Sequence, residues 1–341
     1  MSSPPPLLAV ASISFAFSLL FTPIVRAVAR RIGYIDHPDE RKPHPEPTPL
    51  LGGLAVAGAL AAGMVAAAVL LRAPVAVPSA GVLIGGVLSL ALGLVDDRKP
   101  MRPLGKLIGQ LAAALFLVAW GTADGFVASH PALAAAAVVG VVALLNAINF
   151  LDAMDGLVSA LVPIAGLAFV AIALLYGADV DLAVAWGIVG AAAGFLVYNA
   201  PPAKIFLGDA GSHLLGFVLA ALALRALDGA ATWPHIAGVI AILSYPLFDV
   251  IFVVTMRLSE RRAVHVGGVD HTTHRLGRIC GRWGTLGVVS LVSVLGAACG
   301  TWIWGLENEA IAMAAVSCLG LGYAIFGRWL GRVRPTYGFD T

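Results

Sequence analysis

Residues 131–176 read PALAAAAVVGVVALLNAINFLDAMDGLVSALVPIAGLAFVAIALLY, which is two uncharged runs joined by a short polar segment. Each run is close to the roughly 20 apolar residues that a helix needs to cross a bilayer, so the acids of the polar segment lie at the edge of a membrane. If that segment is helical, Asn149, Asp152 and Asp155 share one face and offer the oxygen ligands that Mg²⁺ takes alongside substrate phosphates. The alternative is a helix that ends in water, where acids are common.

The same alternation of apolar runs and polar connections continues through the chain. Of its 341 residues, 60% are hydrophobic and 12% are charged, against roughly 25% charged in soluble domains. The sequence therefore predicts an all-α fold, a polytopic membrane helix bundle that forms one integral membrane domain over residues 1–341. The expected spans are residues 7–25, 51–71, 79–95, 107–122, 131–149, 157–176, 182–198, 210–226, 235–256, 284–304 and 310–327.

The basic residues predict how this bundle is oriented. If the chain crosses the membrane at each of these eleven spans, 19 of its 21 lysines and arginines fall on one side, with Arg72 and Arg225 opposite. Because cytoplasmic loops carry an excess of lysine and arginine, that side is expected to be cytoplasmic, with the N-terminus outside and the C-terminus in the cytoplasm.

A proline-rich segment, residues 36–49, follows the first expected span. Its five prolines favour an extended backbone and exclude a helix. Arg41, Lys42 and His44 make the segment cationic, which suits an anionic substrate. A stiff linker with solvated charges is the alternative.

Further polar clusters fall on the same side. The adjacent acids Asp96 and Asp97 are followed by Lys106; adjacent negative charges either provide a base or are both stabilised by a cation. Lys204 precedes Asp209, which is flanked by glycines just before a helix, a setting in which backbone N–H groups favour phosphate. This segment lacks the spacing of a P-loop, so nucleotide binding of that kind is not expected.

The last large loop contains His271, His274 and Arg275. No cysteine pair or third nearby histidine completes a zinc site, so hydrogen bonding to a sugar or phosphate suits these residues better. Asp249 lies within the ninth span, where a charge costs a few kcal/mol. It is expected to face a polar cavity or a basic partner, and a structural ion pair is an equal alternative.

Acids and cations gathered on one membrane face fit a reaction between a water-soluble polyanion and a lipid phosphate. In this hypothesis the acids seat Mg²⁺, the metal bridges phosphate oxygens, and cationic groups neutralise the moving charge. The products would be a lipid-linked group and a nucleoside monophosphate.

These motifs resemble the polyprenyl-phosphate N-acetylhexosamine-1-phosphate transferases, of the glycosyltransferase family 4 type. The resemblance extends from Asp36 to about Arg278 and rests on four blocks in order: residues 36–53, Asp96-Asp97 with Lys106 and Gln110, residues 146–157, and residues 206–212. The sequence GDAGSHLLG at 208–216 resembles the GlcNAc-1-phosphate branch of the family. Two departures are Thr273, where the family often has a histidine, and Ala153, where it usually has glycine.

The resemblance implies transfer of GlcNAc-1-phosphate from UDP-GlcNAc to undecaprenyl or decaprenyl phosphate, with release of UMP, at the cytoplasmic face of the cell inner (plasma) membrane. It also implies a role for each matching residue. Mg²⁺, with Mn²⁺ as a possible substitute, would be held by Asn149 and Asp209, the latter also counted as catalytic. Asp96 and Asp97 would deprotonate or orient the lipid phosphate, with Lys106 beside it. The remaining substrate-binding positions would be Arg41, Lys42, His44, Asn146, Asp152, Asp155, Lys204, His271, His274 and Arg275.

The expected partners are these two substrates and the membrane, with no nucleic acid. A homodimer is expected by resemblance, and runs of small residues such as 61–68 permit close helix packing. Three alternatives stay open: transfer of another UDP-N-acetylhexosamine phosphate, a phosphotransferase acting on a CDP-lipid, and a transporter. Transporters usually place their charges at mid-membrane on broken helices, whereas the clusters here lie at one rim.

Overall fold

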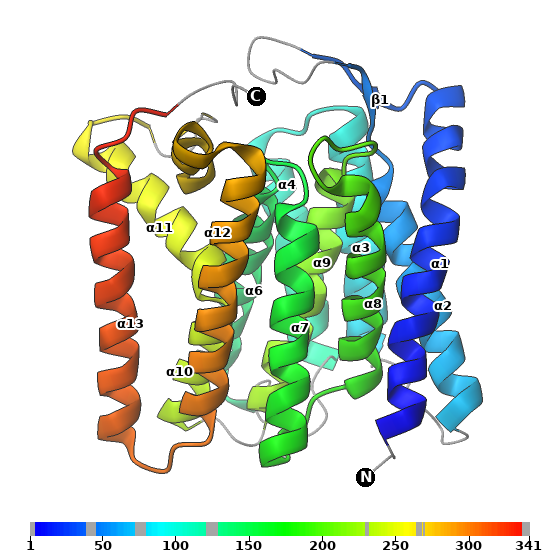
Figure 1. The fold of residues 1–341 in the computed structure, drawn as a ribbon. Helices are drawn as coiled ribbons and strands as arrows, with labels where there is room; N and C mark the ends of the chain where they lie inside the picture. The colour runs from blue at the N-terminus through cyan, green and yellow to red at the C-terminus, as the bar shows by residue number, and fades with distance from the viewer. Residues whose placement is uncertain are drawn as a thin grey trace.

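A computed structural model describes residues 4–38, 46–71, 80–120, 129–228, 232–263, 268 and 270–335. Within these residues, ten helices are long and apolar enough to cross a membrane, or eleven if one bent pair counts as a single span. The predicted all-α, polytopic membrane bundle is therefore confirmed (Figure 1). The helices are α1 (Pro4–Arg31), α2 (Gly52–Leu71), α3 (Ala80–Arg98), α4 (Pro103–Trp120), α6 (Pro131–Leu151), α7 (Leu157–Tyr176), α8 (Leu182–Asn199), α9 (Gly208–Leu227), α10 (Trp233–Ile242), α11 (Ser244–Ser259), α12 (Thr272–Trp304) and α13 (Glu309–Leu330).

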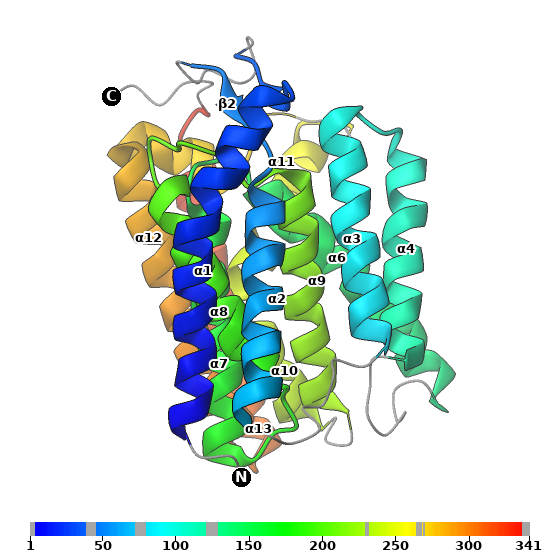
Figure 2. The ribbon, with the colours of Figure 1, turned by 90° about the vertical axis from the view of Figure 1, so that its right-hand side faces the viewer.

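Helix α9 lies at the centre of the bundle. It packs against α2, α3, α6 and α7, and Figure 2 shows it behind α2 with α3 beside it. Glycines allow this close packing: a Cβ atom built on Gly93 of α3 would overlap the backbone of Asp209 and Ala210 in the first turn of α9. The end of α3 is thereby held directly against the start of α9.

Successive passes bring the polar segments after α1, α3, α6, α8 and α11 to one end of the bundle, the upper end in Figure 1. At this end, strands β1 (Ile35–Asp36) and β2 (Thr48–Pro49) pair antiparallel, with Ile35 opposite Pro49. The sequence predicted an extended segment here but not this pairing. Arg41, Lys42 and His44 lie outside the described residues.

The ninth span is not one continuous helix, as the sequence had predicted for residues 235–256. Helices α10 and α11 meet at a bend of 76°, and Leu243 ends one and begins the other. Pro246 explains the break, because a proline lacks the N–H that would bond the carbonyl of Ile242 and its ring clashes with that carbonyl. As a result α11 runs at a slant to the other helices (Figure 1).

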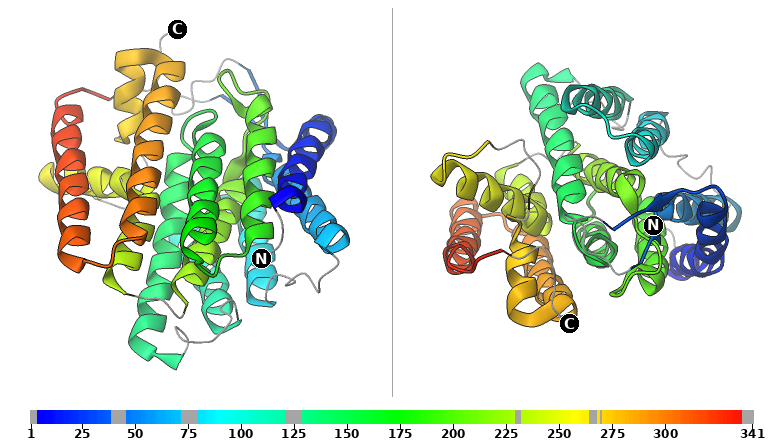
Figure 3. Two further views of the ribbon diagram at one scale, coloured as in Figure 1. Left: turned by 60° about the horizontal axis from the view of Figure 1, so that its bottom comes forward. Right: turned by 90° about the horizontal axis from the view of Figure 1, so that it is seen from above.

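The segment around His271 also differs from the prediction. The sequence placed residues 257–283 in a loop, but α12 begins at Thr272 and is interrupted at Gly281, whose φ of 67° and ψ of −177° are not helical. A φ in this region favours glycine because it has no Cβ. The first turns of α12 form a separate short helix at the upper end of the bundle, seen from above in Figure 3.

Candidate active site

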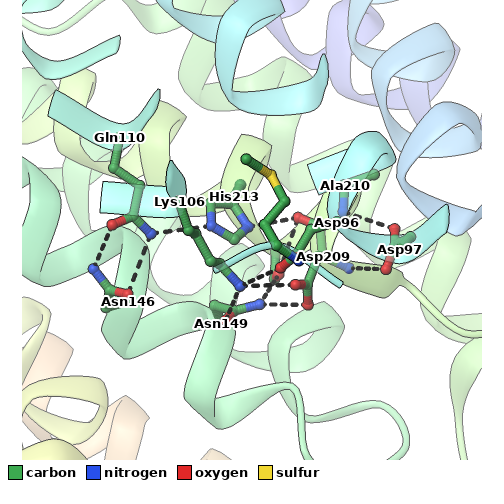
Figure 4. Close-up of polar contacts among 11 residues, drawn as sticks. Asp96, Asp97, Lys106, Gln110, Asn146, Asn149, Asp209, Ala210 and His213 are labelled. Atoms are coloured by element: carbon green, nitrogen blue, oxygen red, sulfur yellow. Dashed lines mark hydrogen bonds and ion pairs between the residues drawn. The ribbon is translucent and has the colours of Figure 1, made fainter. Parts of the chain in front are cut away.

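The predicted clusters at Asp96, Lys106, Asn149 and Asp209 meet at the ends of four helices (Figure 4). The Lys106 Nζ atom lies 2.8 Å from Asp96 Oδ2 and 2.8 Å from Asp209 Oδ2. It also lies 3.1 Å from Asn149 Oδ1. Side chains from α3, α6 and α9 thus converge on the ammonium group of Lys106 in α4.

Asp97 joins this cluster through the backbone of α9. Its carboxylate accepts hydrogen bonds from the N–H groups of Asp209, at 2.8 Å, and Ala210, at 3.1 Å. A negative charge at this position caps the positive end of the helix dipole. Both oxygens of Asp97 are therefore used in holding the first turn of α9, whereas Asp96 accepts from the N–H of Met101 at 2.6 Å and faces Lys106.

Amide side chains from α4 and α6 line the other side of the cluster. Asn149 Nδ2 donates to Asp209 Oδ1 at 2.7 Å and to Ser212 Oγ at 3.0 Å. Asn146 and Gln110 exchange hydrogen bonds at 2.8 and 3.2 Å. Gln110 connects this pair to the backbone of Asp209 through His213, so Asn146 lies at the outer edge of the same network.

The predicted common face of Asn149, Asp152 and Asp155 does not form, because α6 ends at Leu151. Asp152 follows that end, where burial and the negative charges of Asp209, Asp97 and Asp155 raise its pKa well above the usual value. Asp155 turns elsewhere. Its carboxylate accepts from the N–H of Ala203 at 2.9 Å and lies 3.8 Å from the guanidinium of Arg282.

A cationic cleft of about 300 Å³ lies beside Asp155. Its basic residues are Arg26 and Arg30 from α1, Lys204, and Arg282 from α12; its acids are Glu46 and Asp155. The sequence predicted a substrate role for Lys204 and Asp155 but not for the three arginines, which it used only to orient the bundle. The regular spacing of Arg26 and Arg30 in one helix was the signal that they share a face.

Residues 79–227 match the family model described as glycosyl transferase family 4. The chain is 32% identical over 275 residues to the probable undecaprenyl-phosphate N-acetylglucosaminyl 1-phosphate transferase of Bacillus subtilis, covering 77% of this chain and 75% of that relative. The chain belongs to glycosyl transferase family 4. It is also 33% identical over 289 residues to the decaprenyl-phosphate N-acetylglucosaminephosphotransferase of Mycobacterium tuberculosis, covering 74% and 71% of the two chains.

A relative in Thermotoga maritima, an undecaprenyl-phosphate alpha-N-acetylglucosaminyl 1-phosphate transferase, is 26% identical over 284 residues, covering 82% of this chain and 84% of the relative. The segment that matches glycosyl transferase family 4 runs through α3 to α9. It therefore includes every side chain that converges on Lys106: Asp96, Asn149 and Asp209.

In this family member the oxygen atoms around Lys106 fit a hard divalent cation in their chemistry. Among the described residues, no group of three or more histidines, cysteines and acids is close enough to hold a metal by itself. Mg²⁺ does not require one, because it is usually bound by one or two carboxylates together with waters and substrate phosphates. Oxygens of Asn149 and Asp209 already converge on a cationic group here.

The second half of the predicted site surrounds Asp249 in α11. His271 Nδ1 lies 2.7 Å from Asp249 Oδ2, so the basic partner expected for this acid is a histidine. Arg275 is buried and donates to the carbonyl oxygen of Leu330, the last residue of α13, and to those of Gly331 and Val333 just after it. These contacts tie two parts of the fold together, and a substrate role for Arg275 and for the adjacent His274 stays a prediction.

Proposed function

We propose that this chain transfers GlcNAc-1-phosphate from UDP-GlcNAc to a polyprenyl phosphate, undecaprenyl or decaprenyl, and releases UMP. The observation that carries the proposal is the convergence of Asp96, Asn149 and Asp209 on Lys106 at one end of a membrane bundle. The names of the relatives in Bacillus subtilis and Mycobacterium tuberculosis support both the lipid acceptor and the transferred group. The product would start a lipid-linked glycan of the cell envelope.

In the proposed reaction, an oxygen of the lipid phosphate attacks the phosphorus that carries the sugar. The bond from that phosphorus to the UMP oxygen breaks, and UMP leaves with the electron pair. A phosphate monoester has a second pKa near 6, so the attacking group is mostly dianionic at pH 7 and needs little help from a base. A single in-line step is therefore favoured over a covalent enzyme intermediate.

Each polar side chain has a positioning or electrostatic role in this proposal. Lys106 neutralises negative charge that moves between the two phosphates. Asp97, with both oxygens bonded to backbone N–H groups, fixes the first turn of α9 and with it Asp209. Asp96 is left to orient the lipid phosphate through Lys106.

Asn149 and Asp209 would hold Mg²⁺, or Mn²⁺ in its place, and the bound ion would supply positive charge to the phosphate oxygens. Lys106 is the one cation that both Asp96 and Asp209 contact among the described residues, which leaves negative charge for a bound cation to offset. This charge imbalance supports the metal without fixing its identity.

The cationic cleft lined by Arg26, Arg30, Lys204 and Arg282 would take the nucleotide diphosphate. Its volume of about 300 Å³ lies at the lower end of the range for ligand pockets, roughly 300 to 1,000 Å³. Its four basic side chains outnumber its two acids, which suits a polyanion.

The chain is a multi-pass membrane protein, and we place its active site on the cytoplasmic face of the inner (plasma) membrane. The location of all these groups at the arginine-rich end supports this orientation. Accessibility labelling in intact cells, with single cysteines near Asp97 and in the segment after α7, tests it directly. A homodimer is part of the same proposal and is tested by the mass of the purified protein in detergent.

The purified protein should release UMP from UDP-GlcNAc only when undecaprenyl phosphate and a divalent cation are both present. A panel of UDP-sugars, each with and without chelator, identifies the donor, and Asp209→Asn serves as the inactive control. If the protein releases UMP from none of the sugar nucleotides, and proteoliposomes take up a solute without any nucleotide, the result would favour a transporter and overturn the proposal.

A further inference from the structure

The carboxylate of Asp249 is fully buried in α11, and its hydrogen bonds within the described residues go to the start of α12. It accepts from His271 Nδ1 at 2.7 Å, from the backbone N–H of Thr272 at 2.9 Å, and from Thr272 Oγ1 at 2.5 Å. The hydroxyl groups of Tyr245 and Thr272 lie 2.9 Å apart and extend the network. A charge inside a bundle requires this kind of partnership, because an isolated buried charge is very costly.

His271 is the only basic side chain within ion-pair distance of Asp249 among the described residues. Because an ionised carboxylate only accepts hydrogen bonds, Nδ1 of His271 must carry the proton in this contact. Nε2 is then the one ring nitrogen left for a ligand. Nε2 makes no hydrogen bond within the described part of the chain. It is also not one of the polar atoms that are buried there without a hydrogen-bond partner, so Nε2 is accessible to solvent.

The ring of His271 lies close to the residues that converge on Lys106. Its centroid is 6.1 Å from that of Phe150, and Phe150 directly follows Asn149, whose side chain bonds Asp209. Asp249 accepts a hydrogen bond from Thr272, the first residue of α12, and α11 packs against α6. A group held on His271 Nε2 therefore borders the proposed reaction site.

We propose that Asp249 is a positioning residue that fixes the imidazole of His271, so that Nε2 faces the bound sugar nucleotide and accepts a hydrogen bond from one of its hydroxyl groups. This inference rests on the proposed transferase function and adds a residue and a role to it. Asp249 never touches the substrate: it sets the orientation of the ring and keeps the Nδ1 proton turned toward its own carboxylate. The same logic operates wherever a buried carboxylate orients a histidine for catalysis.

A purely structural role for Asp249 makes a different prediction. Its bond to the N–H of Thr272 also caps the first turn of α12, and losing a cap destabilises a helix whatever His271 does. The two roles separate in a double-mutant cycle, because residues that act as a unit are not additive. If Asp249 acts through His271, its substitution has no further effect once the histidine is gone.

The experiment measures UMP release from UDP-GlcNAc, with undecaprenyl phosphate and Mg²⁺, for Asp249→Asn, His271→Ala and the double variant. We expect each single substitution to lower kcat/KM for UDP-GlcNAc about 100-fold and the double variant to equal His271→Ala. Asp270→Asn is the matched control. Asp270 is also a buried acid, immediately before His271, but its partners are Arg257 and Arg262. The loss of kcat/KM caused by Asp270→Asn should therefore multiply with the loss caused by His271→Ala.

The inference is wrong if the loss of kcat/KM in the Asp249→Asn, His271→Ala double variant equals the product of the two single losses. It is also wrong if His271→Ala keeps the kcat/KM of the wild type. Neither result touches the proposed function, which fails only if the wild-type protein in the same preparation releases no UMP. If Asp249→Asn does not fold, Thr272→Val removes one donor to the carboxylate and keeps the charge. Its smaller loss of kcat/KM should likewise disappear in the His271→Ala background, and its persistence there would refute the positioning role.

Discussion

Gly93 lies in α3 where that helix meets the first turn of α9, and its replacement by alanine tests whether this contact positions Asp209. The added methyl group would overlap the backbone of Asp209 and Ala210, and backbone atoms cannot move aside as a flexible side chain does. Restoring an ordinary separation of 3.4 to 4 Å requires a shift of about 1 Å. A misplacement of that size costs about 100-fold in rate.

Gly86 provides a matched control in the same helix. A Cβ atom there would lie 3.8 Å from the side chains of Leu214 and Phe217, which is an ordinary contact. Gly86→Ala should therefore keep its activity and gain up to about 1 kcal/mol of helix stability, whereas overpacking at Gly93 should lower stability by about 1 to 3 kcal/mol.

Steady-state UMP release and thermal unfolding in detergent measure both effects. We expect Gly93→Ala to lose about 100-fold in kcat/KM together with a lower unfolding midpoint, and Gly86→Ala to change neither for the worse. Wild-type activity in Gly93→Ala would show that the contact between α3 and α9 does not position the acid. Equal damage from both substitutions would show that any alanine in this helix is harmful.

Three further outcomes are expected. Asp209→Asn and Asn149→Ala should each abolish Mg²⁺-dependent UMP release, which is the activity that the wild type loses when a chelator is added and which a Mg²⁺ titration measures. An unchanged dependence of UMP release on Mg²⁺ would contradict their role. Arg282→Gln should raise the KM for UDP-GlcNAc about tenfold, the value of one charge-assisted hydrogen bond, and leave the KM for the lipid unchanged. The Arg262 guanidinium lowers the pKa of Asp270. The stability that the ionised Asp270 contributes is therefore present above the unfolded pKa of about 3.9 and is lost as the pH falls through the lower pKa of the folded state. Asp270→Asn should lower the unfolding midpoint at pH 7, and the difference from the wild type should disappear below pH 4.

The sequence predicted which segments cross the membrane because length and apolar composition decide that question almost alone. It did not predict the bend between α10 and α11, since an average over residues 235–256 hides the effect of the single Pro246. It also placed the His271 segment in a loop, because its many charges masked the helix that begins at Thr272.

The sequence placed the acids of the site on one membrane face but did not say which of them would touch. Residues on one face of a bundle can be tens of ångströms apart, and only the packing of α9 against α3 and α6 brings Asp209 to Lys106 and Asn149. The hydrogen bond from His271 to Asp249 joins residues 22 positions apart on two helices. Such a pairing depends on the direction in which α11 runs after the bend, and the presence of Pro246 predicts a break but not that direction.

The central place of α9 also affects how the protein is made. Asp97 and the backbone N–H that it caps are 112 residues apart, so at about 5 to 20 residues per second the ribosome needs roughly 6 to 22 seconds to pass from one to the other. Lys106 and Asn149 are both made during that interval, before the acid that joins them. A nascent chain that stops before residue 208 therefore leaves polar side chains facing an unfilled centre, and its survival depends on whatever shields them from lipid.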